Sequence, residues 1–157
     1  MANWQWFHRL GSPKWLLATL DRWLPWLLSL GLLMLVGALV WGLAFVPPDY
    51  KQGNSFRIMY IHVPTAVVAL AAYYAMAIAG AVAMIWRMKV AFCVATASAP
   101  IGAAFTFLAL VTGAIWGQPM WGTWWEWDPR LTSFLILFLF YLGYYRTPEK
   151  GFKGANN

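Results

Sequence analysis

Charged residues are scarce in this sequence. Only 10% of its 157 residues are Asp, Glu, Lys or Arg, whereas soluble domains contain roughly 25%. Hydrophobic residues make up 62% of the chain, which leaves little polar surface to face water. The composition therefore excludes an ordinary soluble domain and predicts an integral membrane protein.

Cysteine is nearly absent as well. The single cysteine, Cys93, lies within an apolar run, and the sequence contains neither CxxC nor CxxCH. This excludes a dithiol redox pair, a covalent c-type haem attachment site and an internal disulfide. We interpret Cys93 as a small, buried apolar residue.

Acidic residues are also few, five against eleven basic ones, and the formal net charge is +6. A basic chain can bind nucleic acid, but here the basic residues stand at the ends of apolar runs and do not form a patch. Membrane topology explains this distribution better, so we expect lipid and no nucleic acid as a partner.

Long apolar runs are what the sequence does contain. We expect four transmembrane helices at about 24–46, 58–86, 90–116 and 131–145. The first is about 34 Å long as a helix, enough to cross a hydrocarbon core of about 30 Å. The fourth is short, and it needs either tyrosine anchors at the interface or a start within the preceding loop. The fold class is therefore all-α, a polytopic helical membrane protein forming a single domain over 1–157.

The basic residues also predict the orientation. Eight of the eleven Lys and Arg residues lie in the N-terminal segment, in the connection after the second span and in the tail at 146–157. The positive-inside rule then places both termini in the cytoplasm of a multi-pass inner-membrane protein. Residues 1–22, rich in tryptophan and basic residues, are predicted to lie on the cytoplasmic face. We expect no cleaved signal, because the first apolar run is too long and no cleavage site follows it.

The most unusual feature is a predicted periplasmic loop at 117–130. It has four tryptophans in seven positions, Trp121, Trp124, Trp125 and Trp127. Glycine and proline residues within it predict irregular backbone or short helical turns. An interfacial belt explains a single tryptophan, but this cluster predicts a continuous apolar surface with an acidic rim. Such a surface suits a large, flat, apolar ligand with a polar or metal-bearing part.

Two charged residues close this loop. Asp128 could cap the fourth helix, with Pro129 at its first position, or it could have a functional role. Arg130 stands at the outer interface against the positive-inside trend and needs a partner. The sequence leaves open an anionic ligand, Asp128, Glu126 or a lipid phosphate.

A histidine lies on the same outer side, about one turn into the second span. His62 can be an axial ligand of haem iron, or its ring can be satisfied by a backbone carbonyl or by Tyr60. Met59 and Met120 could also ligate iron but are more often apolar filling. His8 lies in the cytoplasmic segment, and we interpret it as solvated. Of the residues inside the four spans, only His62 ionises near neutral pH, which excludes a proton relay.

Two stretches resemble a known family. The run WGTWWEWDPRLTSFLILFLFYLGYY at 121–145 is similar to the tryptophan-rich WWD signature of the haem-handling proteins of cytochrome c biogenesis, and most closely to the haem exporter protein C (CcmC) family. The stretch RIMYIHVPTA at 57–66 is similar to the first histidine segment of that family.

The resemblance implies binding and delivery of non-covalent haem b at the periplasmic face, without catalysis. It implies His62 as one axial ligand of the haem iron. The implied surface for haem and chaperone consists of Trp121, Gly122, Trp124, Trp125, Trp127, Asp128 and Arg130. The implied partners are a membrane-anchored periplasmic haem chaperone, the subunits of an ATP-binding cassette transporter and a small single-span protein.

The chain departs from the family in one respect. Members typically have six spans, with a second ligand histidine in a third outer loop between spans five and six, whereas four spans and no such histidine are predicted here. We therefore expect a fragment, a truncated product or a short form of the family. Two alternatives remain open. One is a structural or assembly subunit that binds no haem, and the other is a tryptophan-loop subunit of a complex that ligates haem to apocytochrome.

Overall fold

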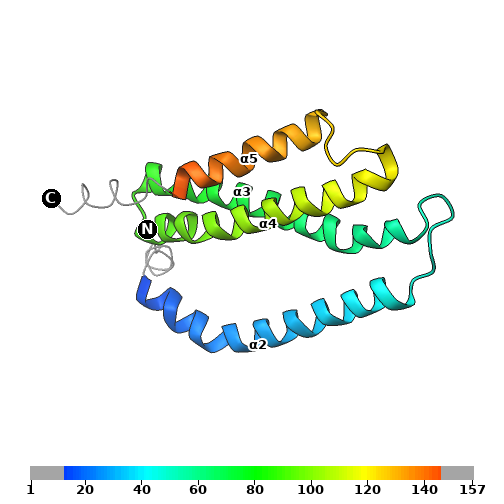
Figure 1. Cartoon of the computed structure of the whole chain (residues 1–157). Helices are drawn as coiled ribbons and strands as arrows, with labels where there is room; N and C mark the ends of the chain where they lie inside the picture. Colours follow the sequence, from blue (N-terminus) through cyan, green and yellow to red (C-terminus); the bar gives the residue numbers. More distant parts are fainter. Residues whose placement is uncertain (1–12, 146–157) are drawn as a thin grey trace, which may run out of the picture.

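The structure, a computed structural model, describes residues 13–145, and this part of the chain is helical without a strand (Figure 1). Three helical stretches, 17–45, 54–86 and 89–121, are long and apolar enough to cross a membrane, and a shorter apolar helix follows them. The chain is thus an all-α polytopic membrane protein, as predicted. Its elements are α2 (Pro13–Val40), the π-helical turn η1 (Trp41–Phe45), the 3-10 turn η2 (Asn54–Ile58), α3 (Met59–Trp86), α4 (Lys89–Trp121) and α5 (Pro129–Tyr145).

The helix bounds follow the apolar runs, with two differences. Helix α2 begins at Pro13, so residues 13–22 continue the first span as helix. The remainder of the predicted interfacial segment, including His8, and the predicted tail at 146–157 lie outside the described residues.

The second difference is at the end of α4. This helix passes through Pro119 and ends at Trp121, five residues beyond the predicted limit, so the start of the predicted loop is helical. The stop is set by Gly122, whose backbone has φ 77° and whose N–H donates to the Gln118 carbonyl at 3.0 Å. A residue in this left-handed conformation is the usual end of an α-helix, and glycine adopts it without strain.

The core is a line of small residues along α4. Its buried positions recur every three or four residues, so they share one face of the helix. They are Ala91, Ala95, Ala99, Gly102, Thr106, Ala109, Gly113 and Gly117. Small residues let neighbouring helices approach closely, which is how helices associate in lipid. Cys93 lies off this face and is exposed, so our prediction of a buried cysteine was wrong.

Tyr141 attaches α5 to the other two helices. Its side chain is only 2% exposed, and its hydroxyl donates to the Ala69 carbonyl of α3 at 3.0 Å. Its ring fills the space beside Gly102 of α4, where an added Cβ would overlap the ring. One aromatic side chain thus joins α3, α4 and α5 into a three-helix unit.

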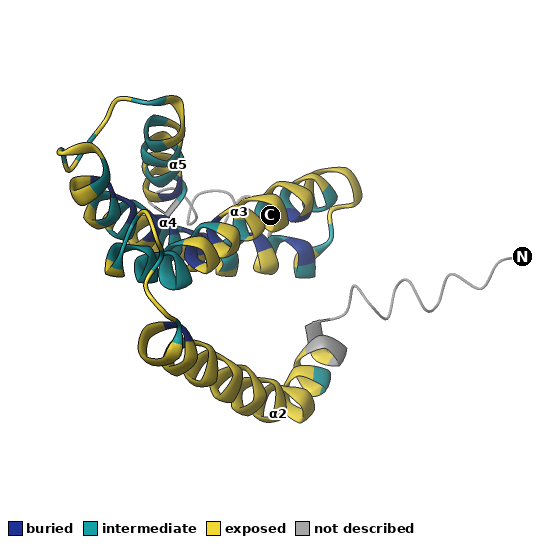
Figure 2. Ribbon diagram, turned by 90° about the vertical axis from the view of Figure 1, so that its right-hand side faces the viewer, coloured by how far each residue is buried: buried dark blue, intermediate teal, exposed yellow. Residues whose placement is uncertain are grey.

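Helix α2 stands apart from this unit, and nearly all of its surface is exposed (Figure 2). Large apolar side chains such as Trp26, 74% exposed, cover it on all sides, as is typical of a helix surrounded by lipid. It is attached just beyond its C-terminal end, where Arg57 donates to the carbonyl of Leu43 in η1 at 2.7 Å and to that of Val46, the next residue after η1, at 3.0 Å.

Both long connections, 46–53 and 122–128, lie at the same end of the helices, which we call the loop end (Figure 1). They bracket the C-terminal end of α4. A hydrogen bond of 2.9 Å from Nε1 of Trp116 to Oε1 of Gln52 links the first connection to that helix. The loop end is therefore where the residues singled out in the sequence can meet.

Candidate functional site

His62 lies in the first turn of α3 and is held by α4. Its Nδ1 makes a hydrogen bond of 3.1 Å with the hydroxyl oxygen of Thr112. The ring also lies against Gly113, where an added Cβ would come within 3.1 Å of its Cε1 atom. The sequence leaves open Tyr60 or a backbone carbonyl as the partner, and the backbone of Ala109 in α4 does lie within hydrogen-bond reach of the ring. The threonine was missed because it is 50 residues away in sequence.

His62 lines a cavity of about 240 Å³ at the loop end of α3, α4 and α5. Four of the eight predicted site residues lie around this cavity, namely His62, Trp121, Asp128 and Arg130. The remaining lining residues have no polar side-chain group except the indole N–H of Trp116, and they are Ala66, Ala109, Leu110, Gly113, Trp116, Leu131 and Phe134. The fold thus brings the histidine, one tryptophan of the loop motif and the Asp–Arg pair to one place.

Two tryptophans form one wall of the cavity. Trp116 and Trp121 meet edge to face, with ring centroids 5.1 Å apart and an interplanar angle of 82°. We call them the cavity pair. The guanidinium of Arg130 lies 5.8 Å from the centre of the Trp121 ring, within range of a cation–π contact. Sequence reasoning missed Trp116, because it ends an apolar run and looks there like an interfacial anchor.

Asp128 divides its two carboxylate oxygens between two partners. Oδ1 accepts from the Leu131 backbone N–H at 2.7 Å. Because α5 begins at Pro129, this bond caps its first turn, and the predicted capping role of Asp128 is confirmed. Oδ2 accepts from Nε of Arg130 at 2.9 Å and from its Nη2 at 2.7 Å. Among the partners left open for Arg130, the structure shows Asp128. The Leu131 N–H first, and then Arg130, lower the pKa of the Asp128 carboxyl.

Arg130 has hydrogen-bond donors left with which it can bind a further anion. Its side chain is 78% exposed, although it is paired with Asp128. The pair uses Nε and one terminal nitrogen, which leaves the other terminal nitrogen with its N–H donors.

The other tryptophans of the motif form a second group. Trp125 and Trp127 meet edge to face with centroids 5.5 Å apart, and we call them the loop pair. Trp124 and Trp127 are 62% and 76% exposed. The Thr123 hydroxyl donates to the Trp125 carbonyl at 3.0 Å and accepts from its N–H at 3.3 Å, which fixes the loop locally. None of the three tryptophans lines the cavity, so the aromatic surface consists of two parts.

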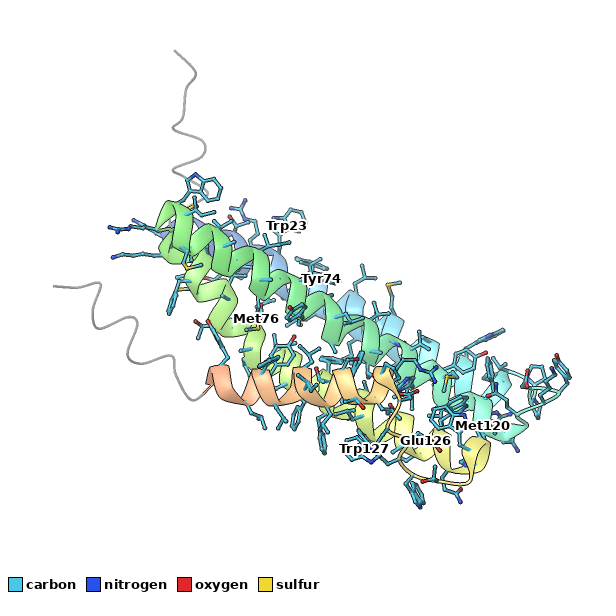
Figure 3. All side chains as sticks on the ribbon, turned by 90° about the horizontal axis from the view of Figure 1, so that it is seen from above. Trp23, Tyr74, Met76, Met120, Glu126 and Trp127 are labelled. Carbon is cyan, nitrogen blue, oxygen red and sulfur yellow. The ribbon has the colours of Figure 1, made fainter. Side chains whose placement is uncertain are left out.

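The remaining candidate ligands lie elsewhere. Met120, Glu126 and Trp127 share the loop end, opposite Trp23 (Figure 3). Neither Met59 nor Met120 is among the cavity-lining residues. Within residues 13–145, no group of three His, Cys, Asp or Glu side chains is placed to hold a bare metal ion. One imidazole among aromatic walls fits iron that arrives already held in a macrocycle, since the macrocycle supplies the other ligands.

Comparison with known proteins agrees with this arrangement. Residues 6–150 match the model of the family described as "Heme exporter protein C". The chain is 55% identical to the "Heme exporter protein C" of Haemophilus influenzae over 140 residues, which is 89% of this chain and 57% of that protein. It is 48% identical to that of Escherichia coli K12 over 140 residues, with the same coverage. It is 52% identical to that of Bradyrhizobium diazoefficiens over 134 residues, 85% of this chain and 51% of that protein.

The fold and the cavity define a polytopic all-α membrane protein with a histidine and tryptophan site at the loop end of its helices. Its particular family follows from the match over most of its length. The chain belongs to the heme exporter protein C family. It spans a little over half of the length of the curated relatives it matches.

Proposed function

We propose that the chain binds haem b non-covalently in the His62 cavity and delivers it to a periplasmic haem chaperone during maturation of c-type cytochromes. One observation carries the proposal. His62, Trp121 and the Asp128–Arg130 pair come from three helices and the WWD loop, yet they line one cavity. The name shared by the relatives, "Heme exporter protein C", supports the same ligand.

The size of the cavity suggests how haem is held. Pockets that enclose a drug-sized ligand measure about 300–1,000 Å³. At about 240 Å³ the cavity takes one edge of the macrocycle and leaves the remainder outside. In this proposal His62 is an axial ligand of the iron, the cavity pair contacts the porphyrin, and the free donors of Arg130 face a propionate. Partial enclosure suits a protein that must release its cargo.

Delivery needs a surface that the cavity does not supply. Trp124 and Trp127 are exposed beside the cavity, and exposed tryptophans are frequent anchors of protein interfaces. Nε1 of Trp125 is buried and, within the described residues, has no hydrogen-bond partner. We assign the docking of the membrane-anchored chaperone to this part of the loop. The role is binding and transfer rather than catalysis, with the transporter subunits and the small single-span protein as further partners.

This function needs the loop end to face the periplasm. In the sequence, Lys and Arg are more frequent in the segments predicted to be cytoplasmic, and this excess supports that orientation in a bacterial inner membrane, with both termini in the cytoplasm. The predicted domain layout, with four spans and a periplasmic loop that carries the tryptophans, is part of the proposal.

The first test is the visible absorption spectrum of the detergent-purified chain with added haem, oxidised and reduced. We expect a Soret band and sharp reduced-state bands that His62→Ala removes or shifts. His8→Ala is the matched control, since His8 and His62 are the only histidines, and it should leave the spectrum unchanged. A chain that takes up no haem would contradict the proposal and favour a structural or assembly subunit.

A further inference from the structure

Thr112 is a polar residue in an apolar helix, and the haem-binding function proposed above assigns no role to it. Its hydroxyl oxygen lies 2.7 Å from the Leu108 carbonyl, 3.3 Å from the Ala109 carbonyl and 3.1 Å from Nδ1 of His62. A threonine hydroxyl has a single proton to donate, and three neighbours compete for it.

The chemistry of these neighbours decides where the proton goes. A carbonyl oxygen can only accept, so the 2.7 Å contact with Leu108 requires the hydroxyl proton to point at that carbonyl. The hydroxyl oxygen therefore turns lone pairs toward the imidazole. The 3.1 Å contact with Nδ1 is then a hydrogen bond only if Nδ1 carries a proton.

We infer that Thr112 is a positioning residue that holds neutral His62 as its Nδ1–H tautomer, so that Nε2 keeps the lone pair needed to ligate haem iron. A neutral imidazole has one N–H, so a proton fixed on Nδ1 leaves Nε2 as the basic nitrogen. Metal-bound histidines typically donate their other N–H in this way, which sets both tautomer and ring orientation.

The surroundings of the ring agree with this role. Gly113 lies beside Cε1, and only a residue without Cβ leaves ordinary contact distance there. Thr112 and Gly113 are adjacent on α4, so one turn of that helix supplies both the hydrogen-bond acceptor and the space. The inference rests on the proposed function for the identity of the ligand, but the tautomer is a property of the chain alone.

The test of the tautomer needs no haem. The two histidines of the chain give separate nitrogen signals after labelling with ¹⁵N-histidine, and His62→Ala assigns them. We expect the His62 signals of the neutral form, in detergent micelles, to show Nδ1–H. Thr112→Val keeps the shape but removes the hydroxyl acceptor, and should shift His62 toward Nε2–H although the Ala109 backbone remains beside the ring. Thr112→Ser keeps the hydroxyl and should restore Nδ1–H.

A matched control separates this effect from a general change in α4. Thr96 also bonds a carbonyl of its own helix, that of Phe92 at 3.0 Å, and does not contact His62. Thr96→Val should therefore leave the nitrogen signals of His62 unchanged. An Nε2–H signal in the wild-type chain, or an unchanged Nδ1–H signal in Thr112→Val, would overturn the inference.

The same variants are then titrated with iron protoporphyrin IX. Loss of a hydrogen-bond partner behind a metal ligand typically costs on the order of 10- to 100-fold in affinity, so we expect a loss in this range for Thr112→Val and recovery for Thr112→Ser. Equal haem affinity in wild type and Thr112→Val would overturn the positioning role. A wild-type chain that binds no haem would overturn the proposed function, while the nitrogen signals would still decide the tautomer.

Discussion

The cavity pair and the loop pair have nearly the same ring geometry in different surroundings. Their centroids are 5.1 Å and 5.5 Å apart, and both pairs meet edge to face. Trp116 and Trp121 line a cavity with His62 and Arg130, whereas Trp127 is 76% exposed on a loop. Geometry between two rings therefore does not define a haem site. In the proposed function, the side chains around the rings assign one pair to ligand binding and the other to a partner surface.

The largest effect that should separate the two pairs is on chaperone docking. Trp124→Ala combined with Trp127→Ala removes the two exposed rings of the loop. Truncation of an interface anchor costs about 2 kcal/mol or more, so we expect docking to weaken at least about 30-fold. Co-purification with the haem-loaded chaperone and titration of the complex measure this effect. Undiminished docking would place the partner surface elsewhere.

Narrowing the cavity should affect haem but not docking. In Gly113→Ala the new Cβ comes within 3.1 Å of His62, and the ring must move. Overpacking of this kind costs about 1–3 kcal/mol, so we expect haem affinity to fall about tenfold.

Gly80→Ala controls for the gain in helix propensity, because a Cβ at Gly80 meets nothing within 4 Å. Haem titration followed at the Soret band compares the two variants. If both bind haem equally well, the contact between α4 and the imidazole has no role in the site.

A smaller effect, on the stability of the fold, should follow from removing the hydrogen bond between Trp116 and Gln52. Gln52→Ala removes the acceptor of its Nε1 proton, and the net loss of such a hydrogen bond is about 0.5–1.5 kcal/mol. We expect thermal unfolding in detergent, followed by circular dichroism, to report a lower stability by this amount. Gln118→Ala is the control, because Gln118 is exposed and its side chain makes no such bond within the described residues. Equal melting temperatures of Gln52→Ala and Gln118→Ala would argue that the hydrogen bond between Gln52 and Trp116 does not stabilise the fold.

The smallest effect concerns pH. The Leu131 N–H and Arg130 lower the pKa of Asp128, so the ionised carboxylate stabilises the folded chain. For a lowered pKa, this contribution is complete above the pKa of the unfolded chain, roughly 4, and is lost as pH falls through the folded value. Asp128→Asn keeps a capping oxygen but not the charge.

The melting temperature of wild type should therefore exceed that of Asp128→Asn at pH 6, and the difference should shrink below about pH 4. A difference that stays constant from pH 3 to pH 8 would show that the charge of Asp128 contributes nothing.

The features that could be predicted from the sequence are the local ones. A long apolar run needs only its own residues to predict a helix, and α3 matches its predicted span to within a residue. The Asp128 cap is also local, because its acceptor and the Leu131 N–H are three residues apart. Gly122 ends α4 through its left-handed backbone conformation. This glycine is visible in the sequence, but Gly117 and Pro119 come first and predict an earlier end of the helix.

The features that could not be predicted depend on distant parts of the chain. The contact between His62 and Thr112 needs the relative placement of α3 and α4, which no single run encodes. The exposure of Cys93 depends on which face of α4 meets its neighbours. The division of the tryptophans into two pairs follows from the course of the loop after Gly122, which cannot be predicted from the order of neighbouring residues.

The most direct test of this account is a haem titration of Trp121→Ala beside Trp127→Ala, each in the otherwise unchanged chain. The account predicts that Trp121→Ala weakens haem binding about tenfold, because its ring lines the cavity with His62, and that Trp127→Ala stays within about twofold of wild type. A loss in Trp127→Ala that equals or exceeds the loss in Trp121→Ala would contradict it.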